Sequence, residues 1–262
     1  MSNSEPPNRQ PYHVRAIERA IDVIRTFGPG RSALTLSEVA SATGLDRATT
    51  RRMLLTLQDL GYVRADGKRY SLTPMILQLG YSYLSGLSLV EIARPHLQSL
   101  AHALGETASL TILDGDDVVY LDLAASSRLS SVRITVGTRF RAHATSMGRV
   151  LLGGLSTDLV DEYFSRVTAK DRPERLVRPV SELRAEVDEA AHRGWAIVDE
   201  ELEEGLRGVA APIRERRGLV VAAVNVSVHA ARHSIDDVAE LYVPAMLAAA
   251  SSIEADLYGM QT

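Results

Sequence analysis

The first third of the chain has the apolar spacing of three short helices followed by a hairpin. Apolar residues recur every three or four positions over 17–27, which predicts an amphipathic helix that the triplet Gly28-Pro29-Gly30 ends. Thr35 with Glu38 forms a capping box for a second helix, which ends at Gly44. Asp46 caps a third helix that ends at Gly61 and has a buried stripe of Thr50, Met53, Leu54 and Leu57. Residues 62–72 are two alternating runs joined by Asp66-Gly67, a strong hairpin signal.

This order of elements is the plan of a winged helix-turn-helix domain, in which the third helix enters a groove of DNA. The exposed side of the third helix and the hairpin are basic. Arginine can bind guanine bidentately, and cations beside the groove suit phosphates. The predicted DNA contacts are Arg47, Thr49, Thr50, Arg51, Arg52, Arg64, Lys68 and Arg69, Thr50 also belonging to the buried stripe.

The charge distribution agrees with a nucleic-acid partner for the first third only. The whole chain of 262 residues has a net charge of −4. Residues 1–73 hold 11 Arg and Lys against 7 Asp and Glu, whereas residues 74–262 hold 18 against 26. A basic segment followed by an acidic remainder indicates two domains, although an ordinary solvated face could also carry the small positive excess.

The pattern after residue 73 predicts a connector and a mixed domain. Residues 1–11 are expected to be a flexible leader, 12–73 the winged helix-turn-helix domain, 74–90 a helical linker and 91–262 a second domain. The linker is apolar enough to pack on another subunit or on the second domain. Helices are expected at 92–104, 146–152, 157–164, 181–193 and 235–257, and strands at 107–113, 118–123, 131–136, 196–199, 209–213 and 219–228. These elements indicate an α/β (α+β) sandwich around one antiparallel sheet.

Catalytic and metal-binding motifs are missing from the sequence. The chain has no cysteine, which excludes disulfides and thiolate metal sites, and none of the common nucleophile, zinc-protease or nucleotide-binding motifs occurs. The acidic run at 199–204 is interpreted as a solvated loop, and the seven histidines as surface or structural residues. We therefore expect no catalytic residue, no metal and no cofactor. The N-terminus has no apolar signal segment and no stretch resembles a membrane span, so a cytoplasmic location is expected and no membrane partner.

Several blocks of this sequence resemble the IclR family of bacterial transcription regulators. The DNA-binding half is similar at Ala16–Ile24, Leu36–Ala40, Gly44-Leu45, Arg51–Leu57, Leu60–Val63 and Tyr70–Thr73. The second half is similar at His143–Leu152, Arg193–Trp195, Asp199–Arg207 and Ala222–Ser227. Within the family, Gly137–Phe140, Ala144–Arg149 and Glu201–Arg207 resemble the branch that regulates protocatechuate, p-hydroxybenzoate and β-ketoadipate pathway genes.

The resemblance implies a GAF-like effector-binding domain and a homodimer, often a dimer of dimers, that binds double-stranded operator DNA and a small aromatic or dicarboxylic acid. Carried over by position, the effector site consists of Phe140, Ser146, Met147, Val198, Leu206, Gly208, Asn225 and Ser227. Physical reasoning supports part of this set, because a helix start at Ser146 offers free N–H groups to a carboxylate, and Asn225 and Ser227 share one strand face.

Two other functions remain open at this point. One is a hydrolase-type enzyme that uses a carboxylate such as Asp199 with a histidine, although no nucleophile and base stand at a recognisable spacing. The other is an interaction module whose winged helix binds protein. Neither explains a basic recognition helix as directly as DNA binding does.

Overall fold

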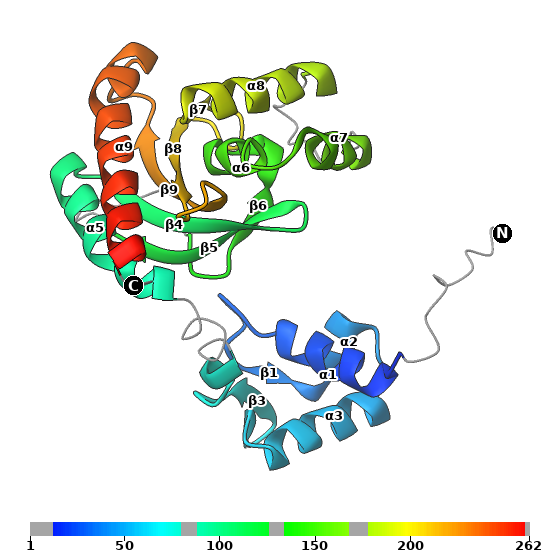
Figure 1. Cartoon of the computed structure of the whole chain (residues 1–262). Coiled ribbons are helices and arrows are strands. Elements are labelled where there is room, and N and C mark those ends of the chain that lie inside the picture. The colour runs from blue at the N-terminus through cyan, green and yellow to red at the C-terminus, as the bar shows by residue number, and fades with distance from the viewer. Residues whose placement is uncertain (1–12, 80–87, 126–133, 168–177, 260–262) are drawn as a thin grey trace. The chain divides into compact units, whose positions relative to one another are not determined.

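The computed structural model describes residues 13–79, 88–125, 134–167 and 178–259 and divides into two compact units, Met1–Gly86 and Leu87–Thr262 (Figure 1). The predicted leader at 1–11 lies outside the described residues. Each unit has its own hydrophobic core.

The first unit is a winged helix-turn-helix domain, as the sequence predicts. Its elements are α1 (Arg15–Arg25), β1 (Leu34–Thr35), α2 (Leu36–Thr43), α3 (Arg47–Asp59), β2 (Val63–Asp66) and β3 (Arg69–Leu72). The capping box of α2 is present, because the Thr35 hydroxyl accepts from the Glu38 N–H and the Glu38 carboxylate accepts from the Thr35 N–H. The short strand β1 was not predicted. It pairs with β3, giving a small sheet in the order β1-β3-β2.

Helix α1 turns a different face to the core than its apolar spacing suggests. Val23 is fully buried, whereas Ile17 is 64% exposed and Ile21 is 40% exposed. The apolar repeat over 17–27 contains Ile17 and Ile21 together with Ile24 and Phe27, but only the second half of this repeat packs against the core in the single chain. The core takes the side of α1 that carries Val23, together with half-buried Ile24 and Phe27.

The predicted linker at 74–90 is only partly described. Residues 76–79 are helical, residues 80–87 lie outside the described part, and α5 begins at Ser88. Met75, Leu77 and Leu79 are exposed, at 40%, 69% and 53% of their surface.

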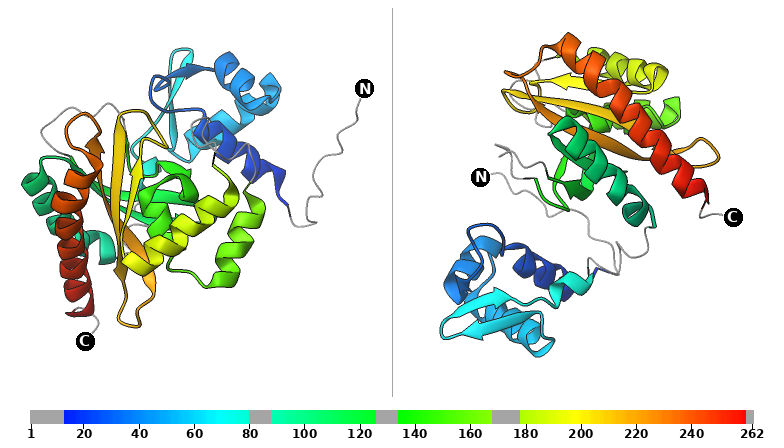
Figure 2. Two further views of the ribbon diagram at one scale, coloured as in Figure 1. Left: turned by 90° about the horizontal axis from the view of Figure 1, so that it is seen from above. Right: turned by 90° about the vertical axis from the view of Figure 1, so that its left-hand side faces the viewer.

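The second unit is a six-stranded antiparallel sheet covered by helices on both faces (Figures 1 and 2). Its strands are β4 (Thr107–Asp114), β5 (Asp117–Ala124), β6 (Arg139–Arg141), β7 (Ala196–Asp199), β8 (Leu206–Arg214) and β9 (Val220–His229). They lie in the order β6-β5-β4-β9-β8-β7. Each neighbouring pair is antiparallel.

One predicted strand of this sheet is misplaced. The sequence predicted a third strand at residues 131–136, of which 131–133 lie outside the described residues. Residues 134–136 are not a strand, and the edge strand is β6, which begins at Arg139. Thr135 and Thr138 hydrogen bond to each other around Gly137, so a tight turn occupies the end of the predicted strand.

The helices form two layers. Helices α5 (Ser88–Leu104) and α9 (Ile235–Gly259) cover one face of the sheet, and η1 (Ala142–Ala144), α6 (Ser146–Leu152) and α8 (Val180–Arg193) lie over the other, with α7 (Thr157–Arg166) beside α8 (Figure 2). Composition alone would let α9 cross a membrane, contrary to the expectation from the sequence. However, Val238, Met246 and Ile253 of α9 are fully buried against the sheet, so α9 is a core helix.

Helix α6 is the centre of the second unit. All seven of its residues are buried, and Gly148 packs directly on the backbone of η1. A β-carbon at position 148 would lie 1.9 Å from the carbonyl oxygen of Ala142, so only glycine allows this approach. This contact fixes the start of α6 above the sheet.

Candidate functional site

The N-terminus of α3 is held by its cap. The Asp46 carboxylate accepts a hydrogen bond from the Thr49 N–H at 2.8 Å. The backbone hydrogen bond from Thr49 is the main reason why the pKa of Asp46 lies below its usual value. Arg47 donates to the Ser37 hydroxyl at 2.6 Å and so links α3 to α2.

Of the residues predicted to contact DNA from α3, the arginines are exposed and the threonines are not. Arg51 and Arg52 are exposed, and neither guanidinium makes a hydrogen bond or ion pair within the described residues, although the charge of Arg52 adds to the lowering of the Asp46 pKa. Thr49 is 6% exposed and Thr50 is fully buried, with its hydroxyl donating to the Asp46 carbonyl at 2.9 Å. The prediction of Thr49 as an exposed residue is therefore wrong: the helix is rotated so that both threonines pack inward. Thr50 was predicted both as a DNA contact and as part of the buried stripe of the third helix, and its burial agrees with the second prediction.

The wing presents three exposed cations. Arg64 donates to the Ser71 hydroxyl at 3.1 Å across the hairpin. Arg69 donates to the Ala33 carbonyl at 2.9 Å, which ties the wing to the residue before β1. Lys68, at the turn of the hairpin, has no partner within the described part of the chain. Lys68, Arg51 and Arg52 are thus the cations of this domain, among those predicted, that remain available to phosphates or bases.

The second unit contains a small cavity between α6 and the sheet. Its volume is about 30 Å³. The lining comes from four strands (β5, β7, β8 and β9), η1, the start of α6 and the connections that carry Ile134 and Leu202. The lining residues are Tyr120, Ile134, Ala144, Thr145, Ser146, Met147, Val198, Leu202, Leu206, Gly208, Asn225 and Ser227. We call this space the inner cavity. Seven of the eight residues predicted for the effector site line it.

The eighth residue, Phe140, is absent from the lining. Its ring instead packs edge-on against Tyr120, with ring centroids 6.0 Å apart. Phe140 therefore supports a wall residue that the sequence analysis missed. Tyr120 lies within a predicted strand, but alternation alone did not distinguish it from the other buried residues of β5.

Asn225 is fully engaged with the protein. Its side-chain oxygen accepts from Ser109 at 3.2 Å, and its amide donates to the Val209 carbonyl at 3.1 Å and to the Ser146 hydroxyl at 3.3 Å. Asn225 is 1% exposed. Both amide hydrogens of Asn225 thus have acceptors in the protein and one of them holds Ser146 in place, so the contact of Asn225 with an effector, which stays a prediction, is left to its side-chain oxygen as an acceptor.

Three hydroxyl groups on the cavity wall keep hydrogen-bonding capacity. The Tyr120 and Ser227 hydroxyls have no partner within the described residues, and no acceptor there takes the Ser146 hydroxyl proton. Burial raises the pKa of Tyr120, so this side chain stays protonated and can donate. The lining contains no charged side chain.

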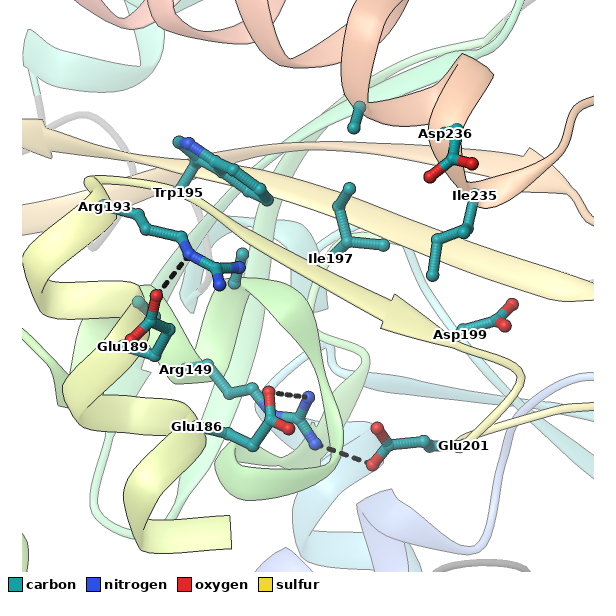
Figure 3. Close-up of a pocket in the computed structure, with 13 residues that line it drawn as sticks. Arg149, Glu186, Glu189, Arg193, Trp195, Ile197, Asp199, Glu201, Ile235 and Asp236 are labelled. Atoms are coloured by element: carbon teal, nitrogen blue, oxygen red, sulfur yellow. Dashed lines mark hydrogen bonds and ion pairs between the residues drawn. The ribbon is translucent and has the colours of Figure 1, made fainter. Parts of the chain in front are cut away.

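A second, more open pocket is lined by residues of α6, α8, β7 and the start of α9 (Figure 3). We call it the outer pocket; its volume is about 370 Å³. It is lined by Arg149, Glu186, Glu189, Arg193, Trp195, Asp199, Glu201 and Asp236, among others. In Figure 3 the guanidinium of Arg149 points between Glu186 and Glu201.

Arg149 is the largest fully buried side chain of the described residues. Its Nη2 lies 2.6 Å from Glu201 Oε2 and its Nη1 lies 3.6 Å from Glu186 Oε2. Burial alone would raise the pKa of Glu186, but the hydrogen bond from Arg178 and the charges of Arg149 and Arg178 together lower it. The acidic run at 199–204, interpreted from the sequence as a solvated loop, therefore neutralises a buried arginine at Glu201.

Metal-ligating side chains do not gather among the described residues. No group of three His, Asp or Glu side chains there is arranged to hold a metal ion. Asp199, the carboxylate of the alternative enzyme hypothesis, is paired with Arg207.

Comparison with known proteins agrees with both units. Residues 16–67 match the IclR helix-turn-helix domain, and residues 81–255 match the C-terminal domain of the bacterial transcriptional regulator IclR. The chain is 38% identical over 250 residues to the Pca regulon regulatory protein of Pseudomonas putida, covering 95% of this chain and 86% of that protein. It is 30% identical over 218 residues to the p-hydroxybenzoate hydroxylase transcriptional activator of Acinetobacter baylyi, covering 81% and 80%.

A solved structure is similar over nearly the whole chain. It is that of an IclR homologue from Microbacterium hydrocarbonoxydans complexed with 4-hydroxybenzoate, with a TM-score of 0.81 and 25% identity. The match covers 92% of this chain and 98% of that one.

The matched family models and the names of the relatives define a DNA-binding regulator rather than an enzyme. The chain belongs to the IclR family of bacterial transcriptional regulators. The family and branch predicted from the sequence are confirmed, since the relatives named for the Pca regulon and for p-hydroxybenzoate hydroxylase belong to that branch.

Proposed function

We propose that this protein regulates genes of aromatic catabolism and that a hydroxylated aromatic acid, such as 4-hydroxybenzoate or protocatechuate, controls its binding to operator DNA. The observation that carries the proposal is the inner cavity, whose apolar walls are combined with the hydroxyls of Tyr120, Ser146 and Ser227, each of which keeps hydrogen-bonding capacity among the described residues. Apolar walls suit an aromatic ring, and a few hydroxyls suit its polar substituents. The names of the relatives point to the same class of compound.

The chemistry of the cavity favours a ring over a flexible dicarboxylate such as β-ketoadipate. A dicarboxylate would bring two negative charges into a space whose lining holds no cation. An aromatic monoacid brings one negative charge, to which the Ser146 hydroxyl can donate a hydrogen bond. The backbone N–H groups at the start of α6 add to this, apart from that of Gly148, which donates to Thr145.

The DNA-binding part of the proposal rests on α3 and the wing. Arg51 and Arg52 are exposed on the helix that enters the major groove in this class of domain, and Lys68 is exposed at the wing tip. We propose base contacts for the two arginines and phosphate contacts for Lys68, with Arg47, Arg64 and Arg69 orienting the helix and wing beside the backbone. The protein would act in the cytoplasm, where the DNA is.

We also propose a homodimer, built through the first unit. Val14, Ile17 and Ile21 form an exposed aliphatic stripe at spacings of three and four, and Leu77 and Leu79 are exposed in the same unit. A monomer would leave these side chains in water, whereas a second copy would cover them. Association of two dimers is the further expectation from the family resemblance.

A ligand screen tests the effector. Protocatechuate, 4-hydroxybenzoate, β-ketoadipate and pyruvate are added separately to the full chain, and thermal unfolding is followed. A ligand at 100 times its dissociation constant stabilises the protein by about 2.7 kcal/mol. We expect this shift for the two aromatic acids and not for pyruvate. A shift with β-ketoadipate alone would contradict the proposed ligand class.

Operator binding tests the regulator itself. Affinity for the DNA upstream of the regulated genes should fall steeply as salt rises, because phosphate contacts release counterions. The effective aromatic acid should change this affinity. An affinity for DNA that is the same with and without each acid in the screen would contradict effector control.

A further inference from the structure

The inner cavity is too small for the ligand that we propose. A volume of about 30 Å³ has room for about one or two water molecules, whereas a dry cavity known to hold benzene measures about 150 Å³. An aromatic acid can therefore enter only if part of the wall moves. The question is which wall element can do so.

Most of the wall is fixed in place. β5, β8 and β9 belong to the central antiparallel ladder, and α6 is buried along its whole length. Two lining residues, Ile134 and Leu202, lie on connections outside the ladder pairs. The connection that carries Ile134 is tied to β5, because the Gly137 N–H donates to the Tyr120 carbonyl at 2.8 Å, whereas Leu202 lies on the connection between β7 and β8. The Leu202 side chain is half-buried and packs against the main core.

The β7–β8 connection, residues 200–205, is a loop whose first and last residues both have a positive φ angle. Glu200 has φ +55° and is the single non-glycine residue with positive φ in the described part of the chain. Gly205, at the other end, has φ +78°. The Gly205 N–H donates to the Glu200 carboxylate at 2.8 Å, which closes the neck of the loop. A compact loop of this kind can move as one piece when the backbone at its two end residues changes conformation.

Glu201 holds this loop down beside Leu202 through its two carboxylate oxygens, one paired with Arg149 and the other lying 3.5 Å from Arg178. Glu201 Oε2 lies 2.6 Å from Arg149 Nη2, and the Arg149 side chain is only 2% exposed. Arg149 belongs to α6, the helix whose first turn lines the cavity. The pair therefore joins the loop to the rigid wall, and charge-assisted contacts of this kind are among the strongest polar contacts in proteins.

We infer that the loop 200–205 is the lid of the inner cavity and that the Arg149–Glu201 ion pair is its latch. Glu201 is a positioning residue: it lines the outer pocket and touches no ligand in the inner cavity, but it holds Leu202 over the entrance. Weakening the pair opens the cavity more often. The inference that an effector passes this lid rests on the proposed function, whereas the opening itself does not.

A cysteine probe measures the opening without any ligand. Because the chain has no cysteine, Ser146→Cys places a single thiol on the cavity wall, at a position that is 1% exposed. Its reaction with a water-soluble disulfide reagent reports how often the cavity opens. Glu201→Gln in this background should speed labelling by about tenfold, which corresponds to about 1.4 kcal/mol of lost latch stability.

Glu189→Gln is the matched control. Glu189 lines the same outer pocket and is paired with Arg193 at 2.5 Å, but it lies on α8 and does not touch the loop. The same charge is removed, and labelling should keep the rate of Ser146→Cys alone. Equal labelling rates in the Glu201→Gln and Glu189→Gln proteins would contradict the role of the Arg149–Glu201 ion pair as a latch.

Global unfolding is separated from lid opening by low urea. Opening of a short loop exposes little surface, so the labelling rate should be nearly flat below the unfolding transition, whereas global unfolding gives a steep rise. A steep rise in Glu201→Gln would refute the lid. Leu202→Ala gives a second measurement that leaves the ion pair intact: it should also speed labelling, and combined with Glu201→Gln its effect should be less than additive.

Ligand kinetics then link the lid to the effector. With 4-hydroxybenzoate as the probe, Glu201→Gln should raise both the association and the dissociation rate by similar factors, since the latch controls passage. If the labelling rates change as expected but 4-hydroxybenzoate does not bind the unmodified protein, the lid is supported and the proposed effector is wrong.

Discussion

Gly208 and Ser146 approach so closely that a β-carbon at position 208 would lie 2.8 Å from the Ser146 hydroxyl oxygen. The sequence predicted both residues for the effector site but not this contact. Glycine at position 208 lets β8 lie directly under the start of α6, so the Ser146 hydroxyl can accept from Asn225 at 3.3 Å. The absence of a side chain therefore determines where a cavity hydroxyl stands.

Gly208→Ala should lower effector affinity without unfolding the domain. The added methyl forces the Ser146 hydroxyl to rotate, at a cost of about 0.5–1.5 kcal/mol of affinity, the net value of one hydrogen bond. Gly208→Leu should fill the cavity and abolish the effector response while DNA affinity stays intact. Calorimetry with the aromatic acid and operator-binding assays measure the two effects.

Gly259→Ala is the control for these substitutions, because nothing lies within 4 Å of a β-carbon there. It should leave effector affinity unchanged. Unaltered affinity in Gly208→Leu would mean that the effector binds outside the inner cavity.

Asn225 and Ser227 should behave differently although both line the cavity. Asn225→Leu leaves Ser109 and Ser146 without their partner, so it should cost about 1–3 kcal/mol of domain stability, measured by urea unfolding. Ser227→Ala removes a hydroxyl that has no protein partner in the described residues, so stability should hold while effector affinity falls by about 0.5–1.5 kcal/mol. Reduced stability in Ser227→Ala with unchanged affinity would argue against a ligand contact.

Local signals in the sequence were sufficient for most elements. The capping box at Thr35, the Asp46 cap and the Asp66-Gly67 turn depend on neighbouring residues, and so they were predicted correctly. The face of α1 that meets the core has a different origin. Ile17 and Val23 both lie in an apolar pattern wide enough for two faces, and which face meets the core depends on α2 and α3 packing against it.

The candidate site was predicted less from physics than from resemblance. Spacing put Asn225 and Ser227 on one strand face, but the satisfaction of Asn225 by Ser109 depends on the pairing of β4 with β9, which no local pattern reveals. Arg149 did leave a signal, since it is the one charged residue in a helix otherwise made of small and apolar residues. Its partner, Glu201, was hidden among the carboxylates of an acidic loop.

The recognition helix should separate base contacts from phosphate contacts. Arg51→Ala or Arg52→Ala should cost about 1–3 kcal/mol of operator affinity and relax the preference at one base pair. Lys68→Ala should weaken binding to all sequences and reduce the salt slope by about 1. Fluorescence anisotropy with operator and scrambled DNA over a salt series measures both; operator affinity equal to that of the unmodified protein in both arginine variants would refute the assignment of α3.

Acid should loosen the start of α3 through Asp46. Hydrogen bonding from the Thr49 N–H lowers the pKa of this carboxyl in the folded chain, so its contribution to stability is complete above its ordinary pKa of about 3.9 and is lost as pH falls through the lower folded value. Hydrogen exchange of the Thr49 amide, corrected for intrinsic rates, should show protection falling over this acid range. Asp46→Asn keeps an acceptor that does not titrate, and its protection should lack the step.

Dimerisation should depend on the exposed stripe of α1. Ile17→Glu places a charge at a position that is 64% exposed in the single chain, so the free energy of unfolding of the monomer should change little. If a second copy covers this side chain, burying the charge without a partner should raise the dimer dissociation constant at least about tenfold, as loss of a central interface contact does. Leu159→Glu, at an exposed leucine of α7 in the other unit, is the matched control and should not change the oligomeric state. Sedimentation at micromolar concentration distinguishes the outcomes, and an Ile17→Glu protein that sediments as the unmodified one does would place the dimer contact elsewhere.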